Sequence, residues 1–276
     1  MFHKTGFVRI GNISISHGMM PNMNTRAIDT HCHPQMRQYD ADREDVIRRA
    51  LDAGVGMVCV GVDLPTSRQA VELAHRYEGL YASVGLHPND NLDEEYEQTE
   101  YVTLAGDQKV VAIGEIGLDY YRTTEPEKKA FQKKRFEQQL ELVRTTGKPV
   151  IIHCRDAHAD MQNLLRTHDV RKGVIHSFTS TLADALLYIE QGFHVGFNGI
   201  ITFARQYDEA VRGIPADRIL LETDSPYLTP QPYRGRRNEP VYILETARAI
   251  AELRGISQEE LLRQTTENTM ALFKIE

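Results

Sequence analysis

The chain has 276 residues, of which 41% are hydrophobic and 26% are charged, and its formal net charge is −7. This length suits one large domain or two small ones with a real core, and no apolar run is long enough to cross a bilayer. The negative charge argues against a broad basic face that holds nucleic acid by electrostatics alone, although a short basic loop or bound metal ions can grip a polyanion locally.

The first residues of the chain differ from the rest, because they alternate only weakly between apolar and polar side chains. We predict an N-terminal extension over residues 1–25, which is an added hairpin, a loose arm or a leader, followed by a domain over residues 26–276. The N-terminus lacks the pattern of a signal peptide. Cys32, Cys59 and Cys154 lie in apolar runs and are expected to be buried, reduced thiols. These features predict a cytoplasmic protein with no membrane contact and no obligate protein partner.

From Arg26 onward, short apolar runs alternate with helix-like segments. Near-continuous apolar runs of this length are typical of parallel strands that are covered on both faces. The predicted strands cover residues 26–33, 55–63, 80–88, 110–119, 149–157, 173–178, 194–200 and 218–228.

The segments between these runs carry amphipathic patterns and ordinary helix stops. Val46, Ile47 and Ala50 share one face of a predicted helix that ends at Gly54, and a longer helix runs from Pro126 to Gly147. Further helices are predicted over residues 181–192, 241–255 and 257–273. Eight strand–helix repeats in about 250 residues indicate a (β/α)8 TIM barrel. A doubly wound open sheet is the alternative, but no Gly-rich loop follows the first strand, as a dinucleotide-binding version requires.

The first predicted strand ends in the motif His31-Cys32-His33, followed by Pro34. Alternate side chains of a strand point the same way, so the two imidazoles face one side and can converge on one metal ion, while Cys32 faces the other. Taken alone, the motif fits a metal site and a pair of partly exposed histidines equally well.

Other predicted strands also carry polar groups in apolar surroundings, near their ends. Buried carboxylates and imidazoles are costly unless they are paired or bound to metal, and in a parallel barrel they gather at the C-terminal mouth, where active sites lie. These groups are His87, Glu115, His153, His176, Glu222 and Asp224.

Six of the polar groups suit direct metal binding. A single catalytic ion takes three protein ligands and a water, so four imidazoles and two carboxylates suit two divalent ions about 3.5–4 Å apart. Mixed nitrogen and oxygen ligands favour Zn or Mn over Mg, although the identity stays open among these. The predicted ligands are His31, His33, Glu115, His153, His176 and Asp224. His87 is predicted to face the substrate, and Glu222 to orient a ligand histidine from behind.

With these residues in place, the sequence resembles the TatD family of metal-dependent deoxyribonucleases, within the amidohydrolase-like barrels. The resemblance covers about residues 27–274, and its motifs are "IDTHCH", "VGLHP", "AIGEIGLDYYR", "KPVIIHCRDA", "GVIHSF" and "LLETDSPYLTP…RGRRNEP". It implies a metal pair in which His31, His33 and Asp224 serve one ion. Glu115 then bridges the two ions, and His153 and His176 serve the other. Pro34 and Gln35 stand where the family often has Leu-Asp, which affects substrate contacts rather than ligands.

The resemblance also implies hydrolysis of DNA phosphodiesters. We expect Asp224 and Glu115 to be the catalytic carboxylates, with Asp224 taking the proton of the attacking water. Arg155 is predicted to hold a phosphate, with a rim salt bridge to Asp156 as the alternative. The basic loop after the last strand supplies a predicted phosphate clamp made of Arg234, Arg236 and Arg237. Tyr120, with its neighbours Tyr121 and Arg122, is predicted to stack bases, and packing at the rim is the alternative.

Three functions compete for this site. The first is a nuclease that trims single-stranded DNA from its 3′ end, because a narrow mouth with little positive charge suits a terminus. The second keeps the metals but hydrolyses an amide, a lactone or an aminoacyl ester. The third is a non-catalytic barrel that binds metal or a partner, and the complete ligand set argues against it.

Overall fold

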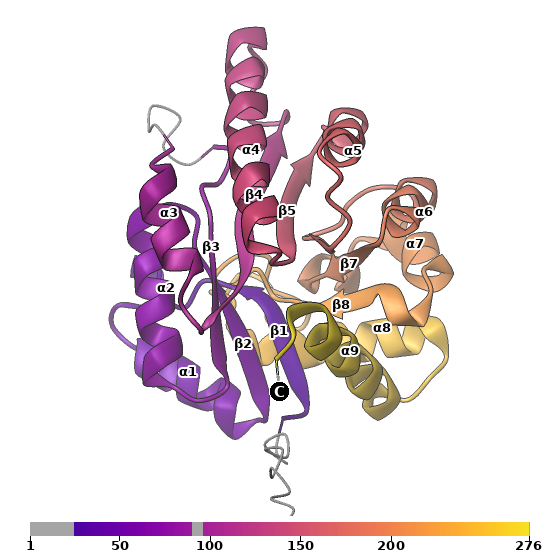
Figure 1. The fold of residues 1–276 in the computed structure, drawn as a ribbon. Helices are drawn as coiled ribbons and strands as arrows, with labels where there is room; N and C mark the ends of the chain where they lie inside the picture. The colour runs from indigo at the N-terminus through magenta and orange to yellow at the C-terminus, as the bar shows by residue number, and fades with distance from the viewer. Residues whose placement is uncertain (1–24, 90–95, 276) are drawn as a thin grey trace, which may run out of the picture.

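The computed structural model describes residues 25–89 and 96–275. Its eight strands form one parallel sheet in the order β1 to β8 (Figure 1). The barrel closes through a parallel bridge between Cys32 and Ser225. The strands are β1 (Ala27–Cys32), β2 (Val55–Val60), β3 (Leu80–Val84), β4 (Val110–Asp119), β5 (Val150–Arg155), β6 (Gly173–Ile175), β7 (Phe193–Phe197) and β8 (Ile219–Leu221). The predicted (β/α)8 barrel is confirmed, and the predicted extension over residues 1–25 lies outside the described residues apart from Thr25.

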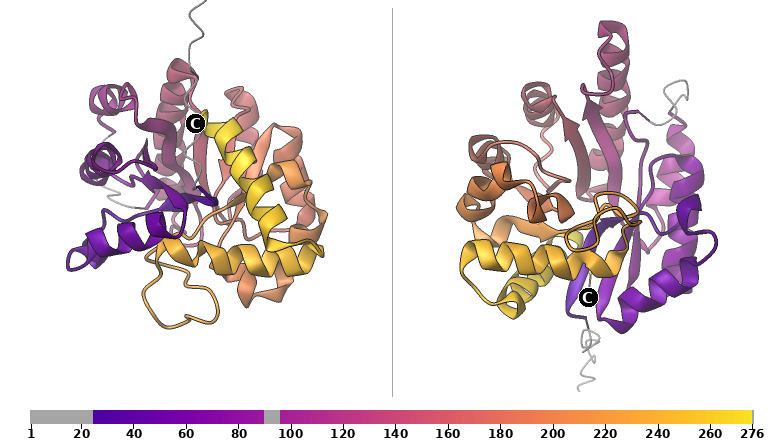
Figure 2. Two further views of the ribbon diagram at one scale, coloured as in Figure 1. Left: turned by 90° about the horizontal axis from the view of Figure 1, so that it is seen from below. Right: turned by 180° about the vertical axis from the view of Figure 1, so that it is seen from behind.

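Helices surround the barrel on its outer side (Figure 2). They are α1 (Arg43–Asp52), α2 (Leu64–Arg76), α3 (Gln98–Ala105), α4 (Pro126–Thr146), α5 (His158–Thr167), α6 (Leu182–Glu190), α7 (Asp208–Gly213), α8 (Ile243–Arg254) and α9 (Gln258–Phe273). Each helix that the sequence predicts is present, within a few residues of its expected ends. Within residues 25–89 and 96–275, none of the helices has both the length and the apolar character that crossing a bilayer requires.

Two apolar layers explain why the strands read as near-continuous hydrophobic runs. Alternate strand residues such as Val58, Val174 and Leu220 form one small cluster with Leu272 and Phe273 of α9. The intervening residues pack against the surrounding helices in a larger cluster. Because both faces of the strands are covered, all residues of β2 and β4 are buried. The three cysteines are buried and free, as expected.

Several predicted strands extend further than the real ones, and the difference matters for the site. β6 ends at Ile175 and β8 at Leu221, so His176, Glu222 and Asp224 lie in the loops that follow. Ser177 and Asp224 have positive φ angles of 47° and 55°. The chain therefore turns sharply out of the sheet at the mouth. Polar and apolar residues both follow the ends of β6 and β8 in the sequence, so the hydrophobic pattern alone does not show where these strands end.

Candidate metal centre and substrate pocket

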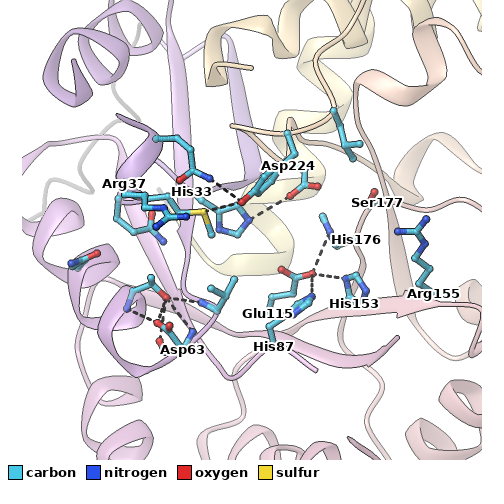
Figure 3. Close-up of a pocket in the computed structure, with 18 of the residues that line it drawn as sticks. His33, Arg37, Asp63, His87, Glu115, His153, Arg155, His176, Ser177 and Asp224 are labelled. Carbon is cyan, nitrogen blue, oxygen red and sulfur yellow. Dashed lines mark hydrogen bonds and ion pairs between the residues drawn. The ribbon is translucent and has the colours of Figure 1, made fainter. Parts of the chain in front are cut away.

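The predicted metal ligands meet at the C-terminal mouth of the barrel (Figure 3). His31 comes from β1, Glu115 from β4 and His153 from β5, while the remaining ligands stand just past β1, β6 and β8. Within three groups of side chains at this mouth, made of the predicted ligands and His87, the donor atoms lie within 4.8 Å of one another. The groups are His31, His33 and Asp224; His31, Glu115 and His176; and His87, Glu115 and His153.

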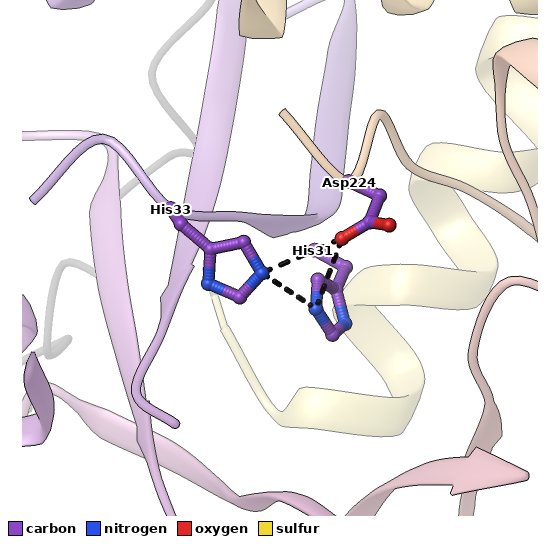
Figure 4. Close-up of side chains that lie close together, drawn as sticks. All are labelled: His31, His33 and Asp224. Carbon is purple, nitrogen blue, oxygen red and sulfur yellow. Dashed lines mark hydrogen bonds and ion pairs between the residues drawn. The ribbon is translucent and has the colours of Figure 1, made fainter. Parts of the chain in front are cut away.

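The first group joins the two ends of the barrel sheet (Figure 4). The Nε2 atoms of His31 and His33 lie 3.1 Å apart. Asp224 Oδ1 lies 3.8 Å from the Nε2 of His31 and 3.4 Å from that of His33. The imidazole of His33 donates its Nδ1–H to the Val60 carbonyl at 2.7 Å. Its Nε2 therefore keeps a lone pair directed at the same point as the carboxylate, which suits a metal ion.

Glu115 stands between the first group and the other histidines. Its Oε2 lies 3.3 Å from His31 Nε2. Its Oε1 lies 2.8 Å from His153 Nδ1, 3.4 Å from His176 Nε2 and 3.7 Å from His87 Nε2. One carboxylate with a different set of imidazoles at each oxygen has the form of a bridging ligand.

Glu222 supports His176 from behind, where the sequence places it. Its Oε1 lies 2.9 Å from His176 Nδ1 and accepts the backbone N–H of Ser177 at 2.7 Å. The side-chain amide of Asn198 also donates to this oxygen, at 3.3 Å. This contact orients the ring so that Nε2 faces Glu115, which is the usual arrangement behind a metal-bound histidine.

Asp119 plays the corresponding part for His153, and the sequence analysis missed it. It is fully buried at the end of β4, and its Oδ2 lies 3.2 Å from His153 Nε2. Its Oδ1 accepts the backbone N–H of Arg122 at 2.9 Å. The available signal was a second acid, at the end of a strand whose only other charged residue is Glu115, within the motif "GEIGLD".

His87 differs from the other histidines in the way its ring is held. Its Nδ1 accepts the backbone N–H of Asn89 at 3.3 Å. In the neutral ring, the proton is then on Nε2, the atom that faces Glu115. His87 is thus arranged as a hydrogen-bond donor toward the cavity, whereas His33 presents a lone pair.

The carboxylates of the cluster stay ionised. Burial by itself raises the pKa of Glu115, but His176, His87 and His31 outweigh it and hold that pKa well below its usual value. The pKa of Asp224 is also lowered, because His33 and the neighbouring rings overcome the effect of burial. For His176, burial by itself lowers the pKa, but the negative charges of Glu222 and Glu115 outweigh burial and raise this pKa to about 10. Buried negative charge facing imidazole nitrogens fits a divalent cation well.

Backbone contacts fix the relative positions of these groups. The N–H of Asp224 donates to the His31 carbonyl at 2.8 Å, which ties the loop after β8 to β1. Gly117 pairs with His153 in the register of β4 and β5. A Cβ at position 117 would lie 1.9 Å from the His153 carbonyl oxygen, so only glycine allows this approach.

The cluster opens into a cavity of about 1440 Å³. Its lining includes His33, His87, Glu115, His153, His176 and Asp224, together with Arg122 and Arg155. Arg155 follows His153 at the end of β5 and is exposed (Figure 3). Its guanidinium lies 3.8 Å from the ring centre of Tyr121. The Arg155–Asp156 pair that the sequence offered as the alternative is not among the ion pairs of the described residues.

Four predicted substrate residues do not line this cavity. Tyr120 is half-buried, and its hydroxyl donates to Asp160 at 2.7 Å. Arg234 packs its guanidinium 4.0 Å from the ring centre of Phe203, and Arg236 is exposed on the loop after β8. Arg237 forms two hydrogen bonds to Asp42, at 2.8 and 2.7 Å. The cavity therefore brings His87 and Arg155 together with the predicted metal ligands, and these four residues are not part of its lining.

Comparison with known proteins identifies the family of this chain. A family model described as TatD related DNase covers residues 28–274. The chain belongs to this family. The TatD resemblance that the motifs indicated is confirmed, and the protein is a metal-dependent hydrolase of the TatD family with donor clusters able to bind metal.

The match with individual relatives covers nearly the whole length of each of them. The uncharacterized metal-dependent hydrolase YabD of Bacillus subtilis is 42% identical, over 90% of this chain and 98% of that protein. The 3′-5′ ssDNA/RNA exonuclease TatD of Klebsiella pneumoniae is 36% identical, over 87% of this chain and 94% of its own. The crystal structure of YJJV, a TatD homolog from Escherichia coli, superimposes with a TM-score of 0.86 at 30% identity, over 92% of this chain and all of that one.

Proposed function

We propose that this TatD-family protein is a nuclease that removes nucleotides from the 3′ end of single-stranded DNA. The observation that carries the proposal is the shared cavity, in which Arg122 and Arg155 stand beside the buried cluster of imidazoles and carboxylates. Guanidinium groups next to such a cluster suit a phosphodiester, because they pair with phosphate oxygens that a neutral amide or ester lacks. The relatives that are named 3′-5′ ssDNA/RNA exonucleases support the same class of substrate.

The donor groups suit two divalent ions, with Zn, Mn or Mg as candidates. His31, His33 and Asp224 would hold one ion, His153 and His176 the other, and Glu115 would bridge them. When bound, such ions act as Lewis acids toward the phosphate and lower the pKa of water. The Nδ1 atom of His153 and the Nε2 atom of His176 are the free donors of the second site, because Asp119 and Glu222 lie at their other nitrogens.

The residues of the chain divide the chemistry among them. Asp224 orients the attacking water and accepts its proton. The water oxygen bonds to phosphorus and the P–O3′ bond breaks, so the terminal nucleotide leaves as a 5′-monophosphate. The proton that Asp224 accepted is returned to the O3′ oxygen, and the shortened strand ends in a 3′ hydroxyl. The Nε2–H of His87 and the guanidinium of Arg155 donate to the non-bridging oxygens, so the phosphate is held while its charge rises. Glu115 lies between the donor groups of the two proposed ions and holds them at a constant separation.

A cytoplasmic location stays part of this proposal. It agrees with free, buried thiols at Cys32, Cys59 and Cys154, since reduced cysteines are usual in that compartment.

Metal-stripped protein tested on single-stranded DNA with a 5′ label examines this function directly. Mg²⁺, Mn²⁺ or Zn²⁺ is added back separately, and Asp224→Asn is compared with Asp52→Asn, an exposed carboxylate of α1 outside the cavity. We expect a metal-dependent ladder of shortened strands that disappears in Asp224→Asn and persists in the control. Immediate release of a labelled mononucleotide would contradict the 3′ polarity.

A metal-loaded protein that cuts no nucleic acid would contradict the nuclease proposal. The ligand cluster would then serve the alternative reaction, hydrolysis of an amide, a lactone or an aminoacyl ester. Activity on those substrates that is insensitive to Arg155→Ala would support that alternative.

A further inference from the structure

Two exposed tyrosines line the cavity that holds the metal ligands. Among the described residues, six large hydrophobic side chains are exposed: Val102, Tyr121, Leu186, Leu187, Phe203 and Tyr227. Only the two tyrosines belong to the lining of this cavity. Tyr121 is 60% exposed and Tyr227 is 48% exposed, so neither ring is explained by burial in the core.

Tyr121 is held in place by its neighbours rather than left to turn freely. It is the second residue after β4, and the guanidinium of Arg155 lies 3.8 Å from its ring centre. Arg122, which also lines the cavity, is the next residue along the chain. An aromatic face flanked by cations suits a base together with its adjacent phosphate.

Tyr227 is fixed by a separate set of contacts. Its backbone N–H donates to the carbonyl of Asp224 at 2.8 Å, which ties its backbone to a predicted metal ligand three residues earlier. Its hydroxyl accepts from the Gln38 side-chain amide at 3.1 Å. The amide of Asn238 donates to its carbonyl. Both the backbone and the ring edge are therefore anchored while nearly half of the side chain faces solvent.

The two rings belong to loops that leave opposite strands of the barrel. Tyr121 follows β4 and Tyr227 follows β8, and these strands are half a turn apart in an eight-stranded barrel. Glu115 and Asp224 line the same cavity. A strand whose phosphate lies over the carboxylates would thus bring one base toward each ring.

We propose that Tyr121 and Tyr227 are base-stacking platforms for the two nucleotides on either side of the scissile phosphate. This inference rests on the proposed nuclease function and extends it to the form of the substrate. Bases inside a duplex stack on each other and do not offer their faces, whereas an unpaired end does. Because every base has a π-face, the two platforms select an unpaired strand with little preference for sequence.

The experiment uses the full, metal-loaded chain and three 5′-labelled single-stranded DNAs. One DNA is unmodified, one has an abasic site at the 3′-terminal nucleotide, and one has it at the penultimate nucleotide. First-turnover cleavage is measured for the wild type, for Tyr121→Leu and Tyr227→Leu, and for the two Tyr→Phe variants. Leucine keeps apolar bulk without a π-face, and phenylalanine keeps the ring.

On unmodified DNA we expect each leucine variant to cleave roughly 10- to 100-fold more slowly, while the phenylalanine variants stay close to the wild type. Each leucine variant should also lose its sensitivity to an abasic site at one position only, and that position should differ between the two variants. A merely structural role predicts instead that all three DNAs slow by the same factor.

Two results would overturn the platforms without touching the nuclease proposal. In one, the leucine variants cleave unmodified DNA as fast as the wild type. In the other, they remain fully sensitive to both abasic positions. Failure of the wild type to cleave the unmodified strand would instead contradict the proposed nuclease function itself.

Discussion

At the scale of single residues, the site depends on which nitrogen each histidine presents. His33 donates its Nδ1–H to a backbone carbonyl, and His176 places Nδ1 against Glu222, so both direct Nε2 at the cluster. His153 is reversed, because Asp119 takes its Nε2 and leaves Nδ1 at Glu115. The acceptors behind the rings, a backbone carbonyl for His33 and buried carboxylates for His176 and His153, therefore decide which nitrogen atoms can bind metal.

Replacing Glu222 by glutamine should weaken metal binding. The amide keeps the volume of the side chain but removes the charge next to His176 Nδ1, so we expect roughly 10- to 100-fold lower metal affinity. Titration of the stripped protein with Zn²⁺ against a chromophoric chelator measures the change, and Glu190→Gln at the exposed end of α6 is the control. Equal affinities in both variants would show that Glu222 does not orient the ligand.

His194 should make the fold sensitive to acid independently of the metal site. It starts on β7, away from the mouth, and burial together with Arg218 lowers its pKa from 6.5 to about 4. The unfolded chain therefore binds a proton first as the pH falls, and the folded state loses up to about 2 kcal/mol between pH 7.5 and pH 5.

Urea unfolding of the stripped protein at both pH values tests this effect of His194. His194→Gln should lose less stability than the wild type on acidification, whereas His168→Gln, at the end of α5, should behave like the wild type. An equal loss in all three proteins would contradict the assignment.

At the scale of elements, the loop from β8 to α8 is tied to the segment between β1 and α1. Arg237 donates to Asp42 and to the Gln38 carbonyl, and its guanidinium lies 4.4 Å from the Tyr39 ring centre. The side chain of Asn238 joins the same loop to the Thr223 carbonyl. Figure 2 shows this connection projecting from the barrel between β8 and α8. Arg237 therefore anchors this loop to the segment between β1 and α1.

Arg237→Ala and Arg236→Ala should separate anchoring from phosphate contact. Loss of the paired hydrogen bonds to Asp42 should lower stability by about 1 kcal/mol in Arg237→Ala, since the pair is only half-exposed and belongs to a network. Arg236 is exposed, so its removal should leave the urea midpoint unchanged and raise KM for DNA slightly. If Arg237→Ala left the stability unchanged and raised KM for DNA strongly, Arg237 would contact phosphate, as the sequence predicted, and would not act as an anchor.

At the scale of the whole molecule, a net charge of −7 restricts how nucleic acid can be held. Five arginines line the cavity. Arg122 and Arg155 stand on the β4 and β5 side with the predicted metal ligands, whereas Arg37, Arg43 and Arg76 come from the turn after β1, from α1 and from α2. Binding is therefore local to the mouth and does not spread over a basic face.

The salt dependence of cleavage measures this localisation. With two phosphates neutralised by Arg122 and Arg155, the slope of log kcat/KM against log salt concentration should be about −1.4 for a single strand. Arg155→Ala should reduce the slope by about 0.7. A slope of −4 or steeper in the wild type would mean that many more phosphates are contacted than this mouth can reach.

The sequence by itself determined the barrel and the ligand types. Eight apolar runs separated by amphipathic segments require a parallel sheet covered on both faces, and polar groups at the ends of those runs must meet at one mouth, because parallel strands all end on the same side. For that reason His31, His33, Glu115, His153, His176 and Asp224 were predictable as a set, as was Glu222 behind one of them.

Only the tertiary structure decided how the side chains around that set are used. Tyr120 and Tyr121 are adjacent in sequence, yet one bonds to Asp160 on α5 and the other lines the cavity. Arg237 bonds to Asp42, which lies 195 residues earlier in the chain. Asp119 reaches His153 only because β4 pairs with β5. Periodicity states which face of an element a residue occupies, but partners from distant segments depend on how the strands close, and a single sequence does not encode those distances locally.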